Sequence, residues 1–500
     1  MQYSIAIDIG TTTVKCVLFG PGPSVIAEAN KEYKTIMPRP SWAEQNPEDW
    51  WNGAVYGIKS VLAKSGVAAA DIKVISVSSQ APCVLPVDKE GKALHNAMIW
   101  MDRRSREEVD MLAEKIGEER IFDITGNKLD SYFALSETMW MVRHCPEIVD
   151  KTYKFLQVNG YVNMKLTGEF TIDGSHMSLV QICDIRKRDW SDELLTAIGL
   201  DRSKMPRIVN CCEPIGHVSR EAAALTGLST DTVVLAGAVD ATAAALEVGV
   251  YKDGRVAEVT GTSSLVLVGH EKLVTTKGLS YLEGIYPNTV VLFGPMNTAG
   301  GSLKWFRDNL FGGETPDNNA YDLINKEIEA GAKDPSKIIY LPYLSGERAP
   351  IWDPDARGCF IGLNMETSRA QIERAVMEGT CFALLDNLNE AYNIGISKGQ
   401  LLSFGGCTKS DIWLKIKASV IDQQIAIPSV NQGATGGLAN INAAYMGEFA
   451  SAEEACMANL KITKVIDPTP AWVPVYKEMF AIYKDSYAAL KEQFKRLAKI

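Results

Sequence analysis

A chain of 500 residues is too long for a single hydrophobic core, so we expect two domains. A hydrophobic content of 46% with 22% charged residues is that of an ordinary soluble globular protein. The formal net charge of -10 argues against a nucleic acid or an anionic membrane as a partner, but it permits a phosphate ligand, which needs only local donors.

The cysteines and the apolar runs favour the cytoplasm. The 10 cysteines are scattered, with Cys211 next to Cys212 and no Cys-x-x-Cys pair, which is typical of reduced thiols and not of a disulfide framework or a zinc site. No apolar run reaches the length of about 18 residues that a membrane helix requires. The first residues lead straight into an expected strand, so we expect no signal peptide.

The first motif covers residues 5–19, with the sequence Ile-Ala-Ile-Asp-Ile-Gly-Thr-Thr-Thr-Val-Lys-Cys-Val-Leu-Phe. Two apolar runs around a polar turn predict two short strands. Gly10 permits a sharp turn, and the threonines at 11–13 offer hydroxyl and backbone N–H groups to an anion. Asp8, at the end of a buried strand, could hold a hydrated Mg²⁺. Taken alone, the motif also fits an ordinary Gly-Thr hairpin without a ligand.

Residues 256–269 repeat this pattern of strand, Gly-Thr-hydroxyl-hydroxyl and strand. The two copies lie about half a chain apart, which indicates a duplicated domain with two phosphate loops facing one cleft. Because two such loops can bracket a polyphosphate, the pair predicts a nucleotide site far more strongly than either loop does alone.

The first half of the chain contains further clear signals. Asn46 as the N-cap before Pro47 begins a helix that ends at Ser65-Gly66. A strand at 73–79 leads into Gln80-Ala81-Pro82, and the residues after it form a hairpin.

That hairpin leads to Trp100-Met101-Asp102-Arg103-Arg104, at an expected junction between a strand and a helix. Asp102 could hold sugar hydroxyls while an arginine orients it, although a solvated ion pair is the common alternative. Residues 105–230 are expected to be mainly helical, and we assign no chemistry to the isolated His144, His176 and His217.

Asp240 ends a buried strand at 233–240 and is followed by an alanine-rich helix. An aspartate at a helix start can be a simple N-cap. In α/β sheets, however, ligands bind at the carboxyl ends of strands, and Asp240 also comes just before the second phosphate loop. We therefore expect its carboxylate to take a proton from a substrate hydroxyl.

The second half alternates strands and helices. Residues 297–306 are a glycine-rich approach to a helix, and 337–344 predict a strand. Ser368 and Gln371 form a capping box before a long helix. A strand at 401–404, paired glycines and a helix at 411–420 form a turn where a backbone can lie against a flat ring. The last thirty residues predict an amphipathic helix.

Together these motifs resemble the FGGY family of carbohydrate kinases, of the sugar kinase, heat-shock protein 70 and actin superfamily, along essentially the whole chain. The resemblance implies an α/β fold with two ribonuclease H-like (actin-like ATPase) domains, each with a mixed five-stranded sheet, around a central cleft. The expected domains are 1–243 and 244–500. The motifs that carry the resemblance are Asp8-Ile9-Gly10-Thr11-Thr12, Trp42-Ala43-Glu44-Gln45, Trp100-Met101-Asp102-Arg103-Arg104, Gly237-Ala238-Val239-Asp240, Gly261-Thr262-Ser263-Ser264 and Gly405-Gly406-Cys407-Thr408-Lys409-Ser410.

The resemblance also implies roles. It makes Asp240 the general base and places Asp8 at the metal and phosphates, in a transfer of the ATP γ-phosphate, with Mg²⁺, to a sugar hydroxyl. The residues expected at ATP are Asp8, Gly10, Thr11, Thr12, Thr13, Gly261, Thr262, Gly300 and Lys304, with Gly406, Cys407 and Ser410 around adenosine. Those expected at the sugar are Gln80, Ala81, Trp100, Asp102 and Asp240. A turn thiol such as Cys407 can equally be a buried core residue.

Within the family, the chain looks most like the xylulokinases, so we expect D-xylulose as the sugar. Xylulokinases typically have Met-His where this chain has Ala81-Pro82, and Trp-Asn-Asp where it has Trp100-Met101-Asp102. Gluconate, another ketose or a polyol are therefore alternatives. A non-enzymatic actin-like nucleotide switch is a remote alternative. A switch needs no cleft that binds hydroxyls, whereas Trp100, Asp102 and Asp240 are expected to form one. The family's frequent dimers are consistent with a homodimer.

Overall fold

The computed structural model describes residues 2–310, 320–429 and 432–500. The chain forms two compact units. The first unit comprises residues 1–252, 269–291 and 430–460, and the second comprises 253–268, 292–429 and 461–500. The expected single boundary after residue 243 therefore differs from this division, because two later segments return to the first unit.

The first unit is built on a six-stranded sheet with the order β13-β14-β5-β1-β2-β3. β14, β5 and β1 run parallel, whereas β1, β2 and β3 form an antiparallel meander. The expected five strands are thus present, and β13 adds a sixth at the edge. The bounds of these strands are β1 Tyr3–Ile9, β2 Thr13–Gly20, β3 Ser24–Glu32, β5 Ile72–Ser79, β13 Pro214–His217 and β14 Val233–Val239.

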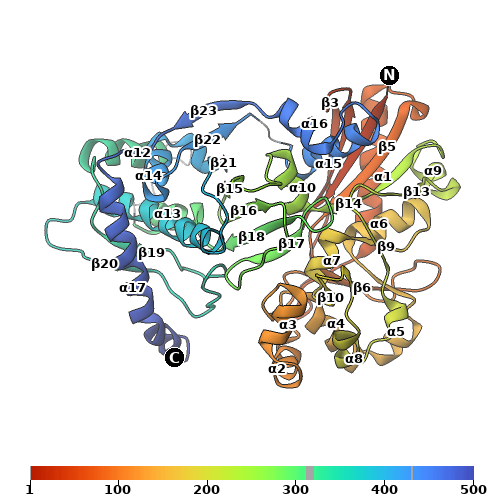
Figure 1. The fold of residues 1–500 in the computed structure, drawn as a ribbon, viewed down its shortest axis with the longest axis horizontal. Helices are drawn as coiled ribbons and strands as arrows, with labels where there is room; N and C mark the ends of the chain where they lie inside the picture. The colour runs from red at the N-terminus through yellow and green to blue at the C-terminus, as the bar shows by residue number, and fades with distance from the viewer. Residues whose placement is uncertain (1, 311–319, 430–431) are drawn as a thin grey trace. The chain divides into compact units, whose positions relative to one another are not determined.

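Helices cover both faces of this sheet, which is why its parallel strands are apolar on both sides. On one face lie α1 (Pro47–Ser65) and α6 (Val158–Thr167), and on the other lie α10 (Asp240–Glu247) and α15 (Ala434–Tyr445) (Figure 1). α1 begins and ends as expected, with the Asn46 side chain accepting from the Glu48 N–H and Gly66 in the left-handed conformation. α15 belongs here because Leu438 and its neighbours join the apolar core behind β1 and β5.

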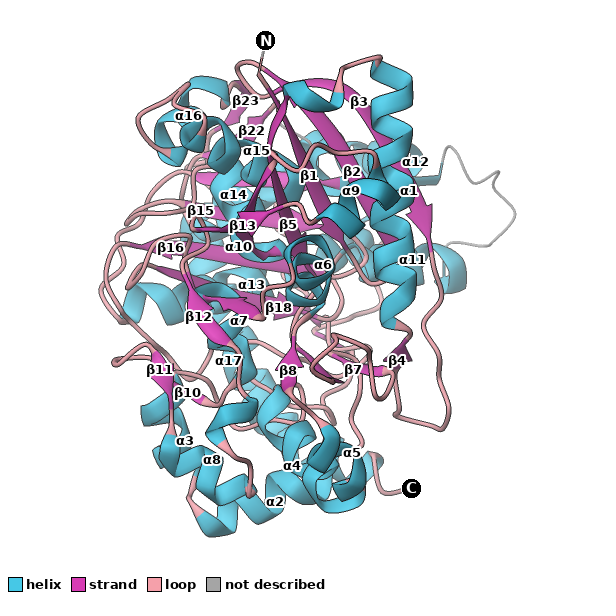
Figure 2. Ribbon diagram, turned by 90° about the vertical axis from the view of Figure 1, so that its right-hand side faces the viewer, coloured by secondary structure: helices cyan, strands magenta, loops and turns pink. Residues whose placement is uncertain are grey.

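The remaining elements of the first unit are short. A four-stranded sheet with the order β4-β7-β6-β8 and the helices α2–α5 and α8 are grouped toward one end (Figure 2). The bounds are β4 Glu44–Gln45, β6 Cys83–Val87, β7 Ala97–Ile99, α2 Arg106–Lys115, α3 Glu118–Thr125, α4 Ala134–His144, α5 Pro146–Lys151, β8 Lys154–Leu156, β9 Thr171–Asp173, α7 Gly174–Val180, β10 Cys183–Asp184, β11 Asp189–Trp190, α8 Asp192–Ile198, β12 Arg207–Val209, α9 Arg220–Thr226, β17 Ser280–Glu283 and α16 Ala452–Asn459.

The second unit repeats this plan, with strands in the order β18-β16-β15-β21-β22-β23. β15 and β16 form the predicted hairpin, and β15, β21 and β22 are parallel. The strand expected at 337–344 is shorter, as β19 pairs with β20 only over residues 339–341 before Pro342. The bounds are β15 Val256–Thr260, β16 Ser264–His270, β18 Val290–Met296, α11 Gly300–Leu310, α12 Ala320–Gly331, β19 Ile339–Leu341, β20 Cys359–Ile361, α13 Arg369–Asn393, β21 Leu401–Gly405, α14 Asp411–Ile421, β22 Ile425–Pro428, β23 Ile462–Ile466 and α17 Val473–Leu497.

The C-terminal helix α17 is held to the second unit by a buried polar cluster. Tyr476 accepts from Arg374 Nη2 at 2.7 Å and donates to Glu378 Oε1 at 2.8 Å. Arg374 and Glu378 are themselves paired at 2.8 Å, and both side chains are fully buried. The predicted amphipathic tail is therefore a packed part of the fold, because its aromatic residues join the core of the second unit.

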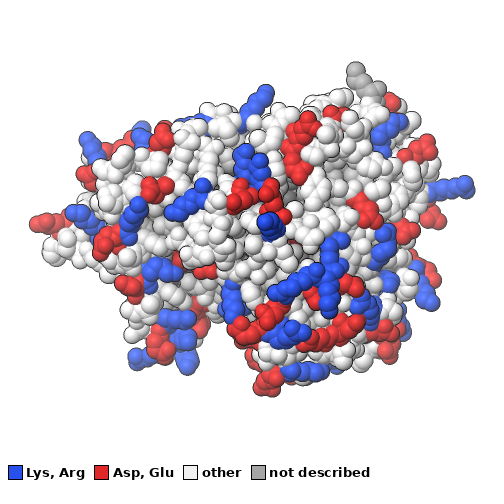
Figure 3. Space-filling model, viewed as in Figure 1, with Lys and Arg blue, Asp and Glu red and all other residues white. Residues whose placement is uncertain are grey.

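The surface and the thiols agree with the composition. In the face shown in Figure 3, acidic and basic side chains are interspersed. All 10 cysteines are free thiols. Among the described residues, we find no helix whose length and hydropathy would let it span a bilayer.

Candidate active site

The carboxyl ends of three parallel strands bring Asp8 and Asp240 to one edge of the first sheet. In the register of the sheet, Asp8 on β1 and Ala238 on β14 both pair with Ser78 on the central β5. Asp240 follows two residues after Ala238, at the start of α10. Parallel strands present their carboxyl ends at a common edge, and α/β sheets bind ligands there. The expectation that Asp240 follows a buried strand at this edge is confirmed.

A bulge next to Gly237 sets the direction of the chain before Asp240. The pairing of β14 with β5 shifts register between Leu235 and Ala238. Gly237 has a φ of 78°, and a Cβ atom there would lie 1.8 Å from the Val77 carbonyl oxygen. Only glycine fits this position, and bulges of this kind re-aim the residues that follow.

The environment of Asp240 favours a base that can hold and release a proton near neutral pH. Burial, followed by the charge of Asp8, raises the pKa of Asp240 to about 7. Burial also raises the pKa of Asp8 to about 6, while a hydrogen bond from Ser78 Oγ (2.8 Å) and the charge of Lys15 oppose this shift. Catalytic bases function best with a pKa near the working pH.

Asp240 is not the N-cap of α10. Val239 occupies that position and makes no side-chain capping bond. The Asp240 carboxylate accepts from the N–H of Ala241 at 2.6 Å, and its second oxygen receives no hydrogen bond within the described chain. The simple capping role therefore has little support, and a carboxylate oxygen is left for a substrate.

The first phosphate loop forms the predicted tight turn. Gly10 N donates to Thr13 O at 3.0 Å, and the residues at 10–13 remain at least partly exposed. Thr11 Oγ1 accepts from the Trp100 indole N–H at 3.1 Å. Thr11, expected at phosphate, and Trp100, expected at the sugar, are therefore in direct contact.

Gln45 connects the two expected binding regions, although no role beyond its motif was expected for it. Its amide N–H donates to Thr11 O at 2.8 Å, while its carbonyl oxygen accepts from Gln80 Nε2 at 2.7 Å and from Trp50 Nε1 at 2.9 Å. Gln45 is completely buried. It therefore fixes Gln80 relative to the phosphate loop.

Gln80 presents an unused acceptor. Its Oε1 atom is buried without a hydrogen-bond partner among the described residues. A buried acceptor without a donor is costly, so a hydroxyl group of a ligand is a suitable partner. The next residue, Ala81, is also buried, and its carbonyl oxygen accepts from the Tyr132 hydroxyl at 3.2 Å.

Asp102 is fully buried, and its oxygens are taken up inside the protein. They accept from the backbone N–H of Ala43 at 2.7 Å and from Arg104, whose Nη2 lies 2.7 Å away. Arg104 also pairs with Glu44 at 2.7 Å and stacks on Trp42, with 3.7 Å between its guanidinium carbon and the ring centroid. Asp102 therefore connects the Trp42-Ala43-Glu44-Gln45 segment to the segment at 100–104. Its expected contact with sugar hydroxyls stays a prediction.

The second phosphate loop repeats the first in the other unit. Gly261 N donates to Ser263 O at 2.8 Å, and residues 261–263 are exposed. The start of α11 crosses this loop, because Gly300 N donates to Gly261 O at 3.0 Å. A Cβ atom on Gly300 would lie 2.4 Å from that oxygen, so glycine is needed for the close approach.

A buried ionic cluster under this loop was not predicted. Glu258 accepts from the hydroxyls of Thr260 and Ser264, which bracket the loop, and from Lys417 Nζ at 2.7 Å. Lys417 also lies 3.2 Å from the Cys407 sulfur. The cluster therefore links the phosphate loop to the turn expected at adenosine. The thiol of Cys407 points into it and is buried, which favours the core-thiol alternative for this side chain.

The other residues expected at the nucleotide have partners inside the second unit. Lys304 pairs with Asp308 on the exposed side of α11. Ser410 is the N-cap of α14, where its Oγ accepts from Trp413 N and donates to Asn325 Oδ1 at 2.8 Å. Gly406 lies in the short turn between β21 and α14. Their contacts with ATP stay predictions.

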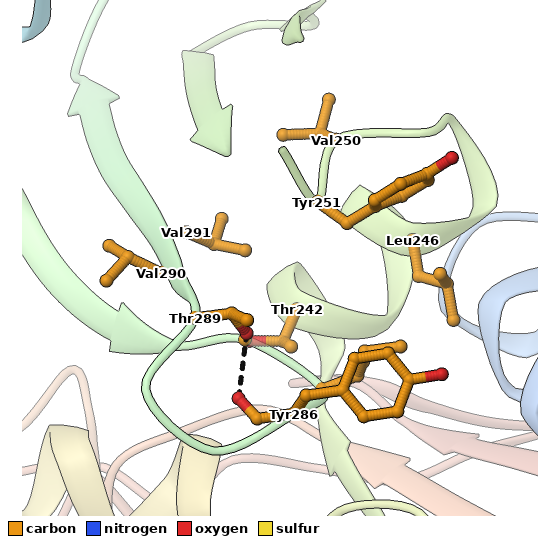
Figure 4. A pocket seen from close by; sticks show the side chains of 10 residues that line it. Thr242, Leu246, Val250, Tyr251, Tyr286, Thr289, Val290 and Val291 are labelled. Carbon is orange, nitrogen blue, oxygen red and sulfur yellow. Dashed lines mark hydrogen bonds between the residues drawn. The ribbon is translucent and has the colours of Figure 1, made fainter. Parts of the chain in front are cut away.

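A narrow recess lies next to α10 and is distinct from the carboxyl edge of the first sheet, where Asp8 and Asp240 lie. Leu246, Val250, Val290 and Val291 line it together with Tyr286 and Thr289, and Thr289 Oγ1 donates to Tyr286 O at 2.7 Å (Figure 4). Its lining is mainly apolar and lacks convergent polar groups, so it does not offer a sugar site.

Comparison with known proteins identifies the family. Residues 3–247 match the N-terminal domain of the FGGY family of carbohydrate kinases, and residues 256–446 match its C-terminal domain. The chain belongs to the FGGY family of carbohydrate kinases. The first match ends at residue 247 and the second begins at residue 256.

The family assignment extends over the whole chain. A xylulose kinase of Bacillus subtilis is 30% identical over 494 residues, which cover 98% of each chain. A gluconokinase of the same organism is 26% identical over 512 residues, with 99% of this chain and 98% of the relative covered. The fold agrees with that of a xylulose kinase from Lactobacillus acidophilus, with a TM-score of 0.93, 24% identity, and 99% and 100% of the chains covered. This protein is therefore a carbohydrate kinase with two actin-like ATPase domains, whose substrates are ATP and a sugar.

Proposed function

We propose that this FGGY kinase transfers the γ-phosphoryl group of ATP to a hydroxyl of D-xylulose, with Asp240 as the general base. The observation that carries the role of Asp240 is its place at the carboxyl edge of β14, where burial and Asp8 raise its pKa to about 7. An alcohol is a weak nucleophile, so a carboxylate that accepts its proton as the new O–P bond forms lowers the barrier.

The donor set at Asp8 fits Mg²⁺, which prefers oxygen ligands and keeps several waters. Asp8 and Asp240 are two carboxylates that lie close enough for one to raise the pKa of the other. No group of three or more potential metal-binding side chains occurs in the described ranges, so Asp8 would hold the ion through water or phosphate. A bound Mg²⁺ supplies positive charge that offsets the charge of the phosphates.

The two loops supply donors for the phosphates. In the first unit these are the backbone and hydroxyl groups of Thr11, Thr12 and Thr13, which lie in an exposed turn after a buried strand. In the second unit, the exposed Gly261 and Thr262 repeat this arrangement. Backbone N–H groups at such turns form concave sites that bind anions without positively charged side chains. A chain with a net charge of -10 can therefore still bind phosphate.

D-Xylulose is the proposed sugar because xylulose kinases match the chain from end to end. The unused acceptor on Gln80 and the indole of Trp100 provide polar and flat surfaces for a small polyhydroxy compound. The residues at 81 and 82 lack the polar side chains typical of xylulokinases, and this is where the chain departs from them.

Gluconate is the second candidate, and one observation favours it. The guanidinium of Arg103 donates to the carbonyl oxygens of Trp100 (2.7 Å) and Asp102 (2.6 Å), and makes no ion pair within the described ranges. It also lies 5.8 Å from the Tyr132 ring centroid. A guanidinium that makes no ion pair among the described residues and lies beside Trp100 can bind the carboxylate of an aldonate, and gluconokinases are among the relatives.

A coupled assay of ADP release tests the proposal on a panel of pentuloses, polyols and aldonates at saturating ATP and Mg²⁺. We expect the highest kcat/KM with D-xylulose. A higher kcat/KM with gluconate than with D-xylulose would point to an aldonate as the substrate. In that case Arg103→Leu should lose its activity on gluconate but keep its activity on a neutral sugar. ADP release with none of the panel would contradict the assignment to these sugar classes.

A further inference from the structure

His176 lies in a buried chain of side chains behind the carboxyl edge of the first sheet, although its sequence position suggested no role. Its Nδ1 atom is 2.6 Å from Asp173 Oδ2, and its Nε2 atom is 2.9 Å from Ser79 Oγ. All three side chains are shielded from solvent. The order Asp-His-Ser is that of a hydrolase triad, but a serine without solvent access cannot attack a substrate. These three hydrogen-bonded side chains therefore have a structural role.

Asp173 is the centre of this network. It ends β9 and is the N-cap of α7, where its Oδ1 accepts from the N–H groups of Ser175 and His176, each at 3.1 Å. Its Oδ2 accepts from Asn159 Nδ2 at 2.9 Å as well as from His176. Burial alone would raise the pKa of Asp173, but His176 and the hydrogen bonds lower it below its ordinary value. A carboxylate with this many donors is rigidly held.

One arm of the network reaches the sugar side. His176 contacts Ser79, the last residue of β5, and Gln80 follows directly. Ser79 Oγ also accepts from the backbone N–H of Asn159 at 3.1 Å and donates to the Gln80 carbonyl oxygen at 3.1 Å. The imidazole therefore fixes the backbone from which the Gln80 side chain extends.

The other arm reaches the base. Ser175 Oγ donates to Asp173 Oδ1 and accepts from the backbone N–H of Val239 at 2.8 Å. Val239 immediately precedes Asp240 and follows the bulge at Gly237, where the sheet ladder is interrupted. A hydroxyl thus supplies the partner that the N–H of Val239 would otherwise lack.

We infer that the Asp173-Ser175-His176 cluster is a positioning device that holds Gln80 and Asp240 in a fixed relation within the first unit. Asp173 anchors two arms, one through His176 to the residue before Gln80, and one through Ser175 to the residue before Asp240. This inference rests on the proposed function, which gives Gln80 and Asp240 their roles. A displacement of either group by less than 1 Å is enough to slow an enzyme, because catalysis depends on alignment.

The two arms predict different kinetic effects. His176→Phe keeps a planar ring but removes both hydrogen bonds of the imidazole. The KM for the sugar should therefore rise about tenfold, which corresponds to the free energy of roughly one hydrogen bond, and the KM for ATP should stay unchanged. Ser175→Ala removes the partner of the Val239 N–H, so kcat should fall about tenfold while the sugar KM changes less than about twofold. Thr226→Val is the matched control, because it removes a buried hydroxyl at the end of α9 that donates to Ala222 O at 2.7 Å and accepts from Leu228 N at 3.3 Å.

A double-mutant cycle protects the test against a simple loss of folding. Ser79→Ala is a small change at the far end of the sugar arm. If His176 acts through Ser79, the double variant Ser79→Ala with His176→Phe should raise the sugar KM no more than the larger single effect. Fully additive effects would overturn the sugar arm.

The outcome also separates this inference from the proposed function. Wild-type kcat and KM in Ser175→Ala and His176→Phe, together with inactivity of Asp240→Asn, would overturn the positioning device and leave the base assignment intact. Equal losses of kcat and of affinity for both substrates in these two variants and in Thr226→Val would show a purely structural effect and would also overturn it.

Discussion

Lys417 Nζ lies 2.7 Å from Glu258 Oε2, and both side chains are almost completely buried below the second phosphate loop. Burial alone would lower the pKa of Lys417, but its neighbours Cys407 and Glu258 raise it above its ordinary value. Because Glu258 also bonds to Thr260 and Ser264, this pair determines the shape of the loop between them.

Breaking the Lys417-Glu258 pair on one side should be strongly destabilising. Lys417→Met leaves an uncompensated buried carboxylate, so the free energy of unfolding should fall by about 3–5 kcal/mol in urea titrations. The double variant with Glu258→Gln should recover part of the loss. Lys477→Met is the control, since Lys477 and Asp422 form an exposed pair whose removal should cost less than about 1 kcal/mol. A loss for Lys417→Met as small as that of the control would contradict this account.

Local patterns predicted most of the fold because they depend on short stretches of chain. The two Gly-Thr hairpins, the cap at Asn46 and the capping box at Ser368 are all present at the expected residues. Each of these features is decided by neighbours within a few positions. The return of residues 430–460 to the first unit was not predicted, because small apolar residues in α15 do not reveal which sheet they cover.

The sequence predicted the groups at the edge of the site better than the groups that support them. Asp8 lies at the end of β1 and Asp240 directly follows β14, and both positions are local signals. By contrast, Ser79 and His176 are separated by 97 positions in the chain, and Glu258 and Lys417 by 159. An isolated histidine or a lysine inside an apolar helix indicates such a contact only when the partner is known. Lys417, on the buried face of the helix at 411–421, was the one available signal.

The thiol of Cys407 should contribute little to nucleotide binding. Its sulfur faces Lys417 and Ser403 in the buried cluster, so any contact with adenosine would come from the backbone of the turn. Cys407→Ala should therefore change the KM for ATP by less than about twofold. Steady-state kinetics with varied ATP measure this value. An increase of about tenfold or more would place the thiol at the nucleotide.

The raised pKa of Asp240 predicts a pH-dependent cost to stability. An acid whose pKa is higher in the folded than in the unfolded chain loses folding free energy as the pH rises from the unfolded value to the folded one. For Asp240 this window runs from 3.8 to about 7. Asp240→Asn lacks the ionisation, so it should match the wild type near pH 4 and exceed it by about 2–4 kcal/mol above pH 7.

Thermal or urea unfolding without nucleotide and Mg²⁺ measures this difference across the window. Asp231→Asn, at an exposed position before β14, is the matched control and should show no such trend. A difference between Asp240→Asn and the wild type that stays constant from pH 4 to pH 8 would show that the pKa of Asp240 is not raised by the fold.

The turnover of Asp240→Asn, measured beside that of Asp231→Asn at saturating ATP, Mg²⁺ and sugar, tests the role of the base most directly. The substitution keeps the shape of the side chain and an acceptor for the Ala241 N–H, but it removes the carboxylate that we propose takes the hydroxyl proton. We expect kcat to fall by at least about 10²-fold while the affinity for ATP changes little. Turnover of Asp240→Asn close to that of the wild type would remove Asp240 from the mechanism.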